Sequence, residues 1–338
     1  MSETNRRYVL GARPEGVPGP ETFELESVPV GEPEGGEILV RTVYLSVDPY
    51  MRDRMDASES YAEPWELGDP MRGAVVGQVA QSKHDSLEAG DYVTGELEWA
   101  EYAVVDGGSV HKIDPELAPL STYLGVLGMP GQTAYFGLLE EGKPRAGDTV
   151  VVSGAAGAVG STVVQIAKLN GCRVVGFAGS DTKVEFLEEI GADVGINYKT
   201  TDDYRTALKN AAPDGVDVYF DNVGGPITDA VFTQLNTDAR VAICGQIAHY
   251  NAESVPTGPR KLPQILTKRA SVSGFIVSDY APRFSQATEQ LGQWVGEGSI
   301  TYRETITEGI ENAPDAFMGL FEGENIGKQL VQVSDESL

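Results

Sequence analysis

The residues with the clearest chemical purpose form a turn rich in glycine and alanine, VVVSGAAGAVG at 150–160. The turn lies between an apolar run and an amphipathic stretch, so the pattern predicts a strand, a tight turn and a helix. Ala155, Gly157 and Gly160 take the three positions of the dinucleotide fingerprint, with alanine at the first. Gly157 lets a pyrophosphate approach the backbone, Gly160 lets helix and strand pack closely, and the helix N-terminus offers N–H groups. The turn therefore predicts dinucleotide binding.

The second predicted strand distinguishes NAD from NADP. About 20 residues beyond such a turn, an NAD-dependent enzyme carries an acidic residue that binds the ribose hydroxyls. Here the strand ends as GFAGSDTK at 176–183, with glycine at that position. A 2′-phosphate meets no carboxylate there, Ser180 and Lys183 can bind it, and Asp181 is expected to face away or to cap the next helix. This charge pattern favours NADPH over NADH.

The elements around the turn alternate between apolar runs and helical patterns. Strands are predicted at 149–153, 173–178, 195–197, 216–221, 240–245 and 271–277, and helices at 160–170, 182–190, 204–212 and 228–235. Such alternation implies right-handed crossovers and a doubly wound parallel sheet. Six strands in this order suit the Rossmann fold. The predicted fold class is therefore α/β, with a six-stranded parallel sheet.

The chain before about residue 118 has a different pattern, with short strands separated by Gly and Pro turns. Predicted strands include 37–45, 73–80 and 91–105; a helical stretch at 120–141 follows, interrupted by GMPG at 128–131. Strand–helix–strand patterns at 302–307, 310–321 and 327–333 close the chain. We expect a mainly β domain at 1–125, a dinucleotide-binding domain at 126–298 and a segment at 299–338 that returns to the first domain.

The net charge of the chain excludes some classes of binding partner. The chain has 51 Asp and Glu against 25 Lys and Arg, a formal net charge of -26 and a pI near 4.4. Non-specific nucleic-acid binding and attraction to anionic membranes need a cation surplus and are not expected. No signal-peptide pattern or run of ~20 apolar residues occurs, so a cytoplasmic location is expected. Because molar salt screens repulsion among the acids, which are spread along the chain, we expect a halophilic protein; an ordinary acidic protein is the alternative.

Metal and hydrolase chemistry find little support in the residue types. The three histidines, His84, His111 and His249, stand at no zinc-ligand spacing with one another or with cysteine. Cys172 and Cys244 are too few for a disulfide framework and are expected to be core thiols. We therefore expect no metal. The turn around Ser153 also lacks the nucleophile elbow of a Ser/His/Asp hydrolase.

Longer motifs recur along nearly the whole chain. They are LSVDPYMR (45–52), GMPGQTAY (128–135), GAAGAVG (154–160), CRVVGFAGSDTK (172–183), NYKT (197–200), FDNVGG (220–225), CGQIAHYN (244–251), GFIV (274–277) and GENIGK (323–328). In this order they resemble the zinc-free branch of the medium-chain dehydrogenase/reductase superfamily, most closely the prostaglandin, alkenal double-bond and curcumin reductases. The resemblance implies a GroES-like catalytic domain beside the Rossmann domain, a homodimer, and a small-molecule enone or enal as substrate. It also implies hydride transfer from NADPH to the β-carbon of that α,β-unsaturated ketone or aldehyde.

The resemblance also assigns cofactor-binding residues. Gly157, Ala158, Val159 and Gly160 would hold the pyrophosphate, and Lys183 and Tyr198 would lie at the adenosine phosphate. The nicotinamide half would be lined by Asn222, Cys244, Gly245, Gln246, Ile247, Tyr250, Phe275, Ile276 and Val277. Asn325 would reach the cofactor from the C-terminal segment. Ser278 and Asp279, before Tyr280, depart from the family pattern, so the substrate pocket there stays open.

The proton and hydrogen-bond donors are predicted from the chemistry that the resemblance implies. Hydride addition to an enone leaves negative charge on the carbonyl oxygen, which needs a donor. Without zinc, that donor is a hydroxyl of a tyrosine or of the cofactor ribose. Tyr250, beside the nicotinamide by resemblance, is the first candidate and Tyr50 the second; either could instead be an apolar wall. A quinone oxidoreductase and a non-catalytic nucleotide-binding protein remain alternatives.

Overall fold

The chain divides into two compact units. The computed structural model describes residues 4–58, 60–254 and 256–336. The β unit consists of the chain up to Leu124, Glu304–Asn325 and the chain from Gln329 onward; the α/β unit consists of Gly125–Arg303 and Ile326–Lys328. Among the helices of the described residues, none combines the length and apolar character needed to cross a bilayer. By the ranges given above, each unit is assembled from segments that are discontinuous in the sequence.

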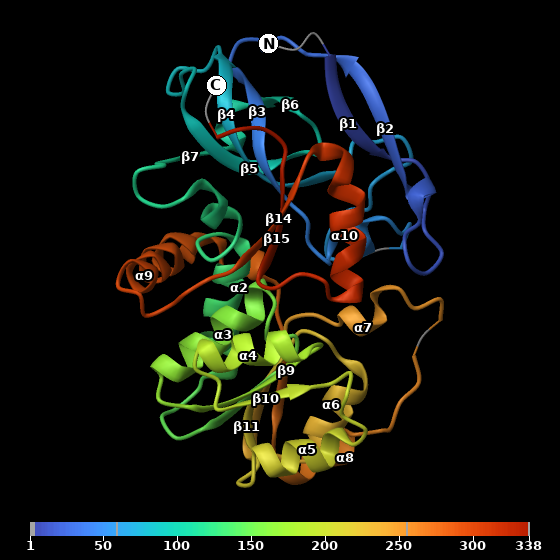
Figure 1. The fold of residues 1–338 in the computed structure, drawn as a ribbon, viewed down its shortest axis with the longest axis vertical. Coiled ribbons are helices and arrows are strands. Elements are labelled where there is room, and N and C mark those ends of the chain that lie inside the picture. Colours follow the sequence, from blue (N-terminus) through green and yellow to red (C-terminus); the bar gives the residue numbers. More distant parts are fainter. Residues whose placement is uncertain (1–3, 59, 255, 337–338) are drawn as a thin grey trace. The chain divides into compact units, whose positions relative to one another are not determined.

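The α/β unit is built on a six-stranded parallel sheet with the strand order β10-β9-β8-β11-β12-β13 (Figure 1). The strands are β8 (Thr149–Val152), β9 (Arg173–Ala178), β10 (Val194–Asn197), β11 (Val216–Asp221), β12 (Leu235–Ile243) and β13 (Ser271–Gly274). The strand order reverses at the β8–β11 pair. That position is the switch point at which doubly wound sheets bind ligands, beyond the carboxyl ends of the strands. The predicted doubly wound sheet is confirmed.

Helices and apolar strands together form the core of this unit. The helices are α2 (Met129–Phe136), α3 (Ala158–Leu169), α4 (Asp181–Glu189), α5 (Tyr204–Ala211), α6 (Gly225–Phe232), α7 (Ile247–Tyr250), α8 (Leu262–Lys268) and α9 (Phe284–Gly296). Helix α3 packs on α2, β8 and β9. The valines of β8 are all fully buried, as expected for a central parallel strand covered on both faces.

Some boundaries differ from the prediction. Strand β12 begins at Leu235, ahead of the predicted start at residue 240, because its register on β11 shifts and Asp238 takes a positive φ of 60° there. Strand β13 ends at Gly274 rather than at residue 277, and Val277–Arg283 forms a 3₁₀ helix. Helices α7, α8 and α9 were not predicted. The polar residues at 236–238 interrupt the apolar pattern of β12, so the sequence predicts a shorter strand than the structure contains.

The β unit contains an antiparallel sheet in the order β14-β15-β3-β4-β5-β7, with β6 paired to β3, and a separate β1–β2 hairpin. Its strands are β1 (Thr4–Leu10), β2 (Phe23–Pro29), β3 (Glu37–Ser46), β4 (Arg72–Ser82), β5 (Tyr92–Glu98), β6 (Tyr102–Asp106), β7 (His111–Ile113), β14 (Glu304–Glu308) and β15 (Lys328–Gln332). Helices α1 (Met51–Arg54) and α10 (Ala313–Glu322) complete it. The single strand predicted at 91–105 is thus two strands, β5 and β6.

The core of the β unit joins residues from both ends of the chain. The rings of Phe23 and Trp99 stack at 6.4 Å, and Phe317 of α10 meets each of them edge-on at 6.1 Å. Trp99 and Phe317 are fully buried. Helix α10 is therefore part of the same apolar core as strand β2.

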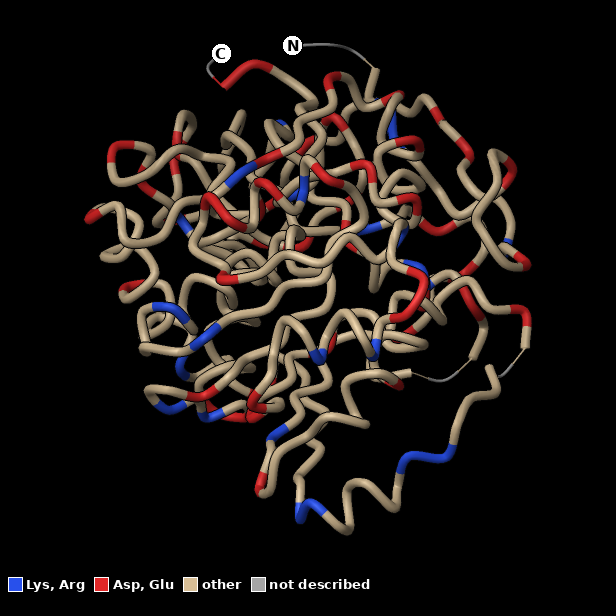
Figure 2. Tube along the Cα trace, turned by 60° about the horizontal axis from the view of Figure 1, so that its bottom comes forward, with Lys and Arg blue, Asp and Glu red and all other residues tan. Residues whose placement is uncertain are grey.

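Acidic residues are not shared equally between the units (Figure 2). The β unit holds 32 acidic and nine basic residues, a formal charge of -23, whereas the α/β unit holds 19 and 16, a formal charge of -3. The expectation of acids spread along the chain therefore holds for the β unit, and the α/β unit is nearly neutral. A unit of this low charge can approach a polyphosphate without strong repulsion.

Candidate active site

The glycine-rich turn joins β8 to α3 and has the geometry that phosphate binding requires. Gly154 has a left-handed φ of 58°, and Gly157 is extended, with φ -81° and ψ 178°, just before the helix. A Cβ on Gly160 would lie 2.3 Å from the carbonyl oxygen of Gly154, so only glycine fits there. A Cβ on Gly157 would meet only that oxygen, at 3.4 Å. No side chain of the described residues caps α3, so no side-chain acceptor satisfies the first N–H groups of this helix.

A segment from the end of the chain contacts the same turn. The N–H of Gly327 donates to the carbonyl oxygen of Ala156 at 2.8 Å, and Gly327 pairs with Gly157 in a parallel bridge. Gly327 has φ 70°, and a Cβ there would lie 1.9 Å from the carbonyl oxygen of Arg303. Asn325, the predicted C-terminal cofactor residue, belongs by its contacts to the β unit. Sequence reasoning singled out Asn325 and missed the glycine that contacts the turn.

The predicted 2′-phosphate residues lie around the end of β9. Ser180 is the N-cap of α4, and its hydroxyl accepts the N–H of Lys183 at 3.3 Å. Asp181 was expected to face away or to cap the helix; Ser180 caps it, and the Asp181 carboxylate accepts the Asn197 amide at 2.6 Å. Burial, and secondarily the charge of Lys199, lower the pKa of Lys183. Two cations thus lie close together where an NAD enzyme would carry an acid.

Tyr198, assigned to the adenosine phosphate side by resemblance, lies against Gly179 in the turn between β9 and α4. A Cβ on Gly179 would be 2.6 Å from the Tyr198 hydroxyl oxygen, so any larger residue there would displace this ring. Burial raises the pKa of Tyr198, and the nearby Tyr204 raises it further. The phenol therefore keeps its proton and remains a hydrogen-bond donor. Sequence reasoning noted Gly179 only as a missing acid, whereas the structure gives it a packing role.

Asn222 begins the loop after β11, next to the glycine-rich turn. Its side-chain amide donates to the Ser153 carbonyl at 2.7 Å, and its N–H donates to the Ser153 hydroxyl at 2.9 Å. That hydroxyl donates in turn to the buried carboxylate of Asp221 at 2.8 Å. The ends of β8 and β11 are therefore locked together at the switch point of the sheet.

Tyr250, the first candidate donor, ends the short helix α7 beyond β12. Its hydroxyl oxygen accepts the N–H of Gln246 at 3.3 Å, and a Cβ on Gly245 would lie 3.2 Å from it. The Gln246 side chain donates to Asp221 at 3.0 Å. Gln246 is therefore bonded directly to the buried Asp221, whereas Asn222 is linked to Asp221 through the Ser153 hydroxyl and Tyr250 through Gln246. His249, also in α7, lies beside Gly224 and Gly225.

The remaining residues assigned to the nicotinamide half differ in orientation. Burial, and secondarily Asp221, raise the pKa of Cys244 to about 12, so its thiol stays protonated. The ring of Phe275 packs on Phe220 with 6.3 Å between centroids, and a Cβ on Gly137 would lie 2.3 Å from it. Phe275 thus directs its ring into the core of the unit. Ile247 begins α7, and Ile276 and Val277 follow β13 at the start of the 3₁₀ helix.

Tyr50, the second candidate donor, lies in the β unit. It precedes α1 as the N-cap residue and packs against the apolar core of that unit. Burial, then the negative charge of Asp48, raise the pKa of Tyr50 well above its usual range. The Asp48 carboxylate accepts the Ser46 hydroxyl. Tyr50 therefore stays protonated and can donate a hydrogen bond, but not act as a base.

Neither a metal cluster nor a reactive thiol stands out in the part of the chain that the structure describes. No group of three or more His, Cys, Asp or Glu is arranged there to hold a metal ion. Cys172 is buried, its thiol contacts the Arg145 carbonyl at 3.4 Å, and burial raises its pKa to about 11. Cys172 is therefore a core thiol as predicted, whereas Cys244, which was predicted to be one too, is only half-buried.

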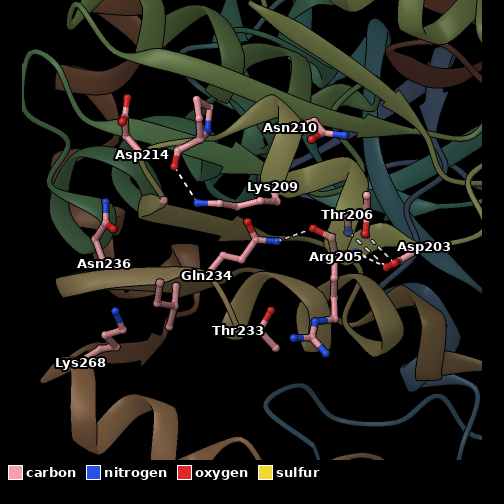
Figure 3. Close-up of a pocket in the computed structure, with 13 residues that line it drawn as sticks. Asp203, Arg205, Thr206, Lys209, Asn210, Asp214, Thr233, Gln234, Asn236 and Lys268 are labelled. Atoms are coloured by element: carbon pink, nitrogen blue, oxygen red, sulfur yellow. Dashed lines mark hydrogen bonds between the residues drawn. The ribbon is translucent and has the colours of Figure 1, made fainter.

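A hollow of about 600 Å³ lies at the opposite edge of the sheet, where β11 and β12 begin (Figure 3). Helix α5 lines it with Arg205 and Lys209, and the Lys209 ammonium donates to the Pro213 carbonyl at 2.8 Å. The Gln234 amide donates to the Arg205 carbonyl at 2.8 Å. None of the predicted site residues lines this hollow, because the glycine-rich turn leaves the sheet at the carboxyl ends of the strands.

Comparison with known proteins agrees with this geometry. Residues 6–113 match the family described as N-terminal domain of oxidoreductase, and 158–293 the family described as zinc-binding dehydrogenase. YfmJ of Bacillus subtilis is 55% identical over 100% of both chains, and the NADPH-dependent curcumin reductase of Escherichia coli is 46% identical over 99% of both. The chain belongs to the curcumin, prostaglandin and alkenal reductase family of zinc-independent medium-chain dehydrogenases/reductases.

Members of this family share the whole fold described above. The crystal structure of CurA from Vibrio vulnificus in complex with NADPH is 45% identical, with a TM-score of 0.94 over 98% of this chain and 99% of that chain. The α/β sheet and the mainly β unit are therefore the Rossmann and GroES-like parts of a curcumin and prostaglandin reductase fold. As a family member, the chain is an oxidoreductase.

Proposed function

We propose that the protein uses NADPH to reduce the C=C bond of α,β-unsaturated ketones and aldehydes, delivering hydride to the β-carbon without a metal. NADP(H) is the cofactor, as the names of its relatives indicate. The relatives are named for curcumin, prostaglandin and 2-alkenal substrates, which share a conjugated carbonyl. The observation that carries the proposal is the α3 N-terminus, which has no side-chain cap beside Gly157, together with Lys183 in the first turn of α4.

The α/β unit supplies the proposed cofactor site. The pyrophosphate would lie over Gly157, where no Cβ intrudes, and would accept N–H groups of Ala158, Val159 and Gly160. Ser180, Lys183 and Tyr198 would bind the 2′-phosphate side, because a phosphate prefers charged and hydroxyl donors. The Asp181 carboxylate keeps its charge, and its position is fixed by the Asn197 side-chain amide, which donates to it at 2.6 Å. When bound, NADPH supplies the hydride.

Two tyrosines are candidates for stabilising the negative charge that develops on the substrate carbonyl oxygen. Negative charge develops on the carbonyl oxygen as the β-carbon receives hydride, and a positioned hydroxyl stabilises it. We assign this role first to Tyr250, whose hydroxyl oxygen accepts the Gln246 N–H at 3.3 Å and whose phenol O–H is a hydrogen-bond donor as well as an acceptor. Tyr50 is the second candidate, since its raised pKa keeps it a donor. The same hydroxyl can relay a proton to the α-carbon.

Side-by-side assays test the proposal against the alternatives. The purified protein would be mixed with NADPH and an alkenal, an alkenone or a benzoquinone, with NADPH absorbance followed and products identified by mass spectrometry. Formation of the saturated carbonyl from the enal and enone is expected. Turnover of the quinone alone would make the protein a quinone oxidoreductase. NADPH binding without turnover of any acceptor would make it a non-catalytic nucleotide-binding protein.

We also propose a homodimer formed through the edge of the α/β sheet. Strand β13 ends the sheet, and its Val272 is 41% exposed. Helix α8 packs on β12 and exposes Leu262 and Leu266 to 75% and 79%. Exposed strand edges and apolar patches favour association. Light scattering should give twice the chain mass of 36.1 kDa, and Val272→Asp should give the single-chain mass. A single-chain mass for the wild type would refute the dimer.

A further inference from the structure

One buried carboxylate gathers the predicted site of the α/β unit around itself. Asp221 ends β11 and is fully buried. Its oxygens accept six hydrogen bonds from described residues. Oδ1 accepts those of Ser153 Oγ (2.8 Å), Tyr219 OH (2.8 Å), Val223 N (3.0 Å) and Gly224 N (2.9 Å), and Oδ2 those of Thr228 Oγ1 (2.7 Å) and Gln246 Nε2 (3.0 Å). None of these six donors carries a charge.

A buried carboxylate without a cation is stable only when donors surround it, so its surroundings have to be fixed in place. The donors come from three separate stretches of chain. Ser153 directly precedes the glycine-rich turn, Val223 and Gly224 form the loop after β11, and Gln246 lies in the loop after β12. These are the three loops at the carboxyl edge of the sheet that the cofactor is proposed to contact. Asp221 therefore sets their positions relative to one another.

The link to Tyr250 runs through Gln246. The side chain of Gln246 is held by Asp221, and its amide oxygen is packed so close to Gly224 that a Cβ there would lie 2.3 Å from it. With its side chain fixed, the N–H of Gln246 donates to the Tyr250 hydroxyl oxygen at 3.3 Å. That donor occupies one lone pair of the phenol and directs its proton elsewhere. Asp221 is thus linked to the candidate donor through a single residue, Gln246.

We propose that Asp221 is a positioning residue that holds the nicotinamide-side loops and, through Gln246, the Tyr250 hydroxyl. This inference rests on the proposed function for its catalytic part, whereas its binding part does not. Because Asp221 is fully buried, it would act through the residues that donate to it rather than by contact with a ligand. Its removal should therefore disturb the nicotinamide side of the site and spare the adenosine side, where Lys183 and Tyr198 lie on other elements.

Asp221→Asn is the conservative test. The N–H groups of Val223 and Gly224 hold an oxygen at the Oδ1 position, so the new amide nitrogen would face Gln246 Nε2, donor against donor. Gln246→Leu cuts the same link and leaves the buried carboxylate in place. Asp217→Asn is the matched control. Asp217 begins the same strand and accepts the Thr149 N–H at 2.8 Å and the Asn236 amide at 2.9 Å, at the opposite edge of the sheet.

The readout compares binding of NADPH with that of 2′-phospho-ADP-ribose, which lacks the nicotinamide. In both test variants NADPH should bind ~10-fold more weakly, as expected for a lost hydrogen bond to a charged group, while the analogue changes by less than ~3-fold. Enone kcat should fall ~10²-fold, the effect of a displacement of about 1 Å at the site. Asp217→Asn should leave both affinities and kcat unchanged.

Equal weakening of both ligands, together with a lower Tm, would show a general structural role and overturn the proposal. Unchanged NADPH affinity in Gln246→Leu would overturn it too, even if Asp221→Asn does not fold. If the wild type binds NADPH but reduces no enone, the proposed function fails. The difference between the two ligands would still test whether Asp221 positions the nicotinamide side.

Discussion

The phosphate-binding turn must let α3 pack closely and must leave space for the pyrophosphate. Gly160→Ala tests the first requirement and Gly157→Ala tests the second. At Gly160 the new Cβ would lie 2.3 Å from the Gly154 carbonyl oxygen and 2.7 Å from the Ala155 Cα. Since real contacts stay above 3.0 Å, α3 must shift by about 0.7 Å. Overpacking of this kind costs roughly 1–3 kcal/mol, partly offset by the ~1 kcal/mol helix preference of alanine. The net loss is up to roughly 2 kcal/mol, which lowers the Tm by up to about 8 °C.

Gly157→Ala should behave in the opposite way. The φ of -81° and ψ of 178° suit alanine, and the new Cβ meets protein only at 3.4 Å, so the Tm should stay within ~2 °C of wild type. The methyl group would instead occupy space proposed for the pyrophosphate. Losing one hydrogen bond to a charged group costs roughly 1.5–3 kcal/mol, which weakens NADPH binding by about 10- to 150-fold.

Differential scanning calorimetry and NADPH fluorescence titration measure the two effects separately. Gly296→Ala is the control, because a Cβ there meets nothing within 4 Å; its NADPH affinity should match that of the wild type and its Tm should not fall below that of the wild type. If Gly157→Ala bound NADPH as tightly as the wild type, the proposed path of the pyrophosphate would be wrong. If it melted early like Gly160→Ala, the steric argument would be wrong.

Four further results are expected. Lys183→Ala should weaken NADPH ~10-fold or more and leave NADH unchanged, as measured by titration, because it removes a charge-assisted bond; equal loss would place the 2′-phosphate elsewhere. A lysine is charged only below its pKa, and burial lowers that of Lys183 below 10.5, so the preference for NADPH over NADH should decline as the pH rises toward that value. A pH-independent ratio would refute this reading. Tyr250→Phe should lower enone turnover ~10²-fold at unchanged NADPH affinity, and unaltered turnover would reassign the donor. The Tm should rise from dilute to molar salt because the β unit carries a formal charge of -23, and no gain would refute halophilic adaptation.

Local patterns in the sequence were sufficient to predict most of the α/β sheet. The apolar run of β8, the glycine-rich turn and the stripe of α3 fall in one short stretch, so periodicity and turn chemistry determine them. The start of β12 could not be predicted in the same way. Its register shift and the positive φ of Asp238 depend on pairing with β11, which lies elsewhere in the chain.

Site residues could be predicted from the sequence where their own charge or turn position indicates their role. They could not be predicted where the role depends on contacts with residues distant in the sequence. The proposed roles of Lys183 and Gly157 in cofactor binding were predicted from the charge of the lysine and from the position of the glycine in the turn. Asp221 looked like the end of an apolar strand, and only the fold reveals that loops distant in sequence donate to it. The close approach of Gly327 to Arg303, far from the turn in sequence, is likewise a product of tertiary structure.

The route of the chain through its two units limits how the protein can be divided. Ile326–Lys328 is a three-residue insertion of the α/β unit between two stretches of the β unit, and its Gly327 pairs with Gly157. A truncation after Arg303 would therefore remove the partner of the phosphate-binding turn along with β14 and β15. Neither half can be obtained by a single cut, so an isolated Rossmann fragment would need the Gly327 strand grafted back before it represented the native pocket.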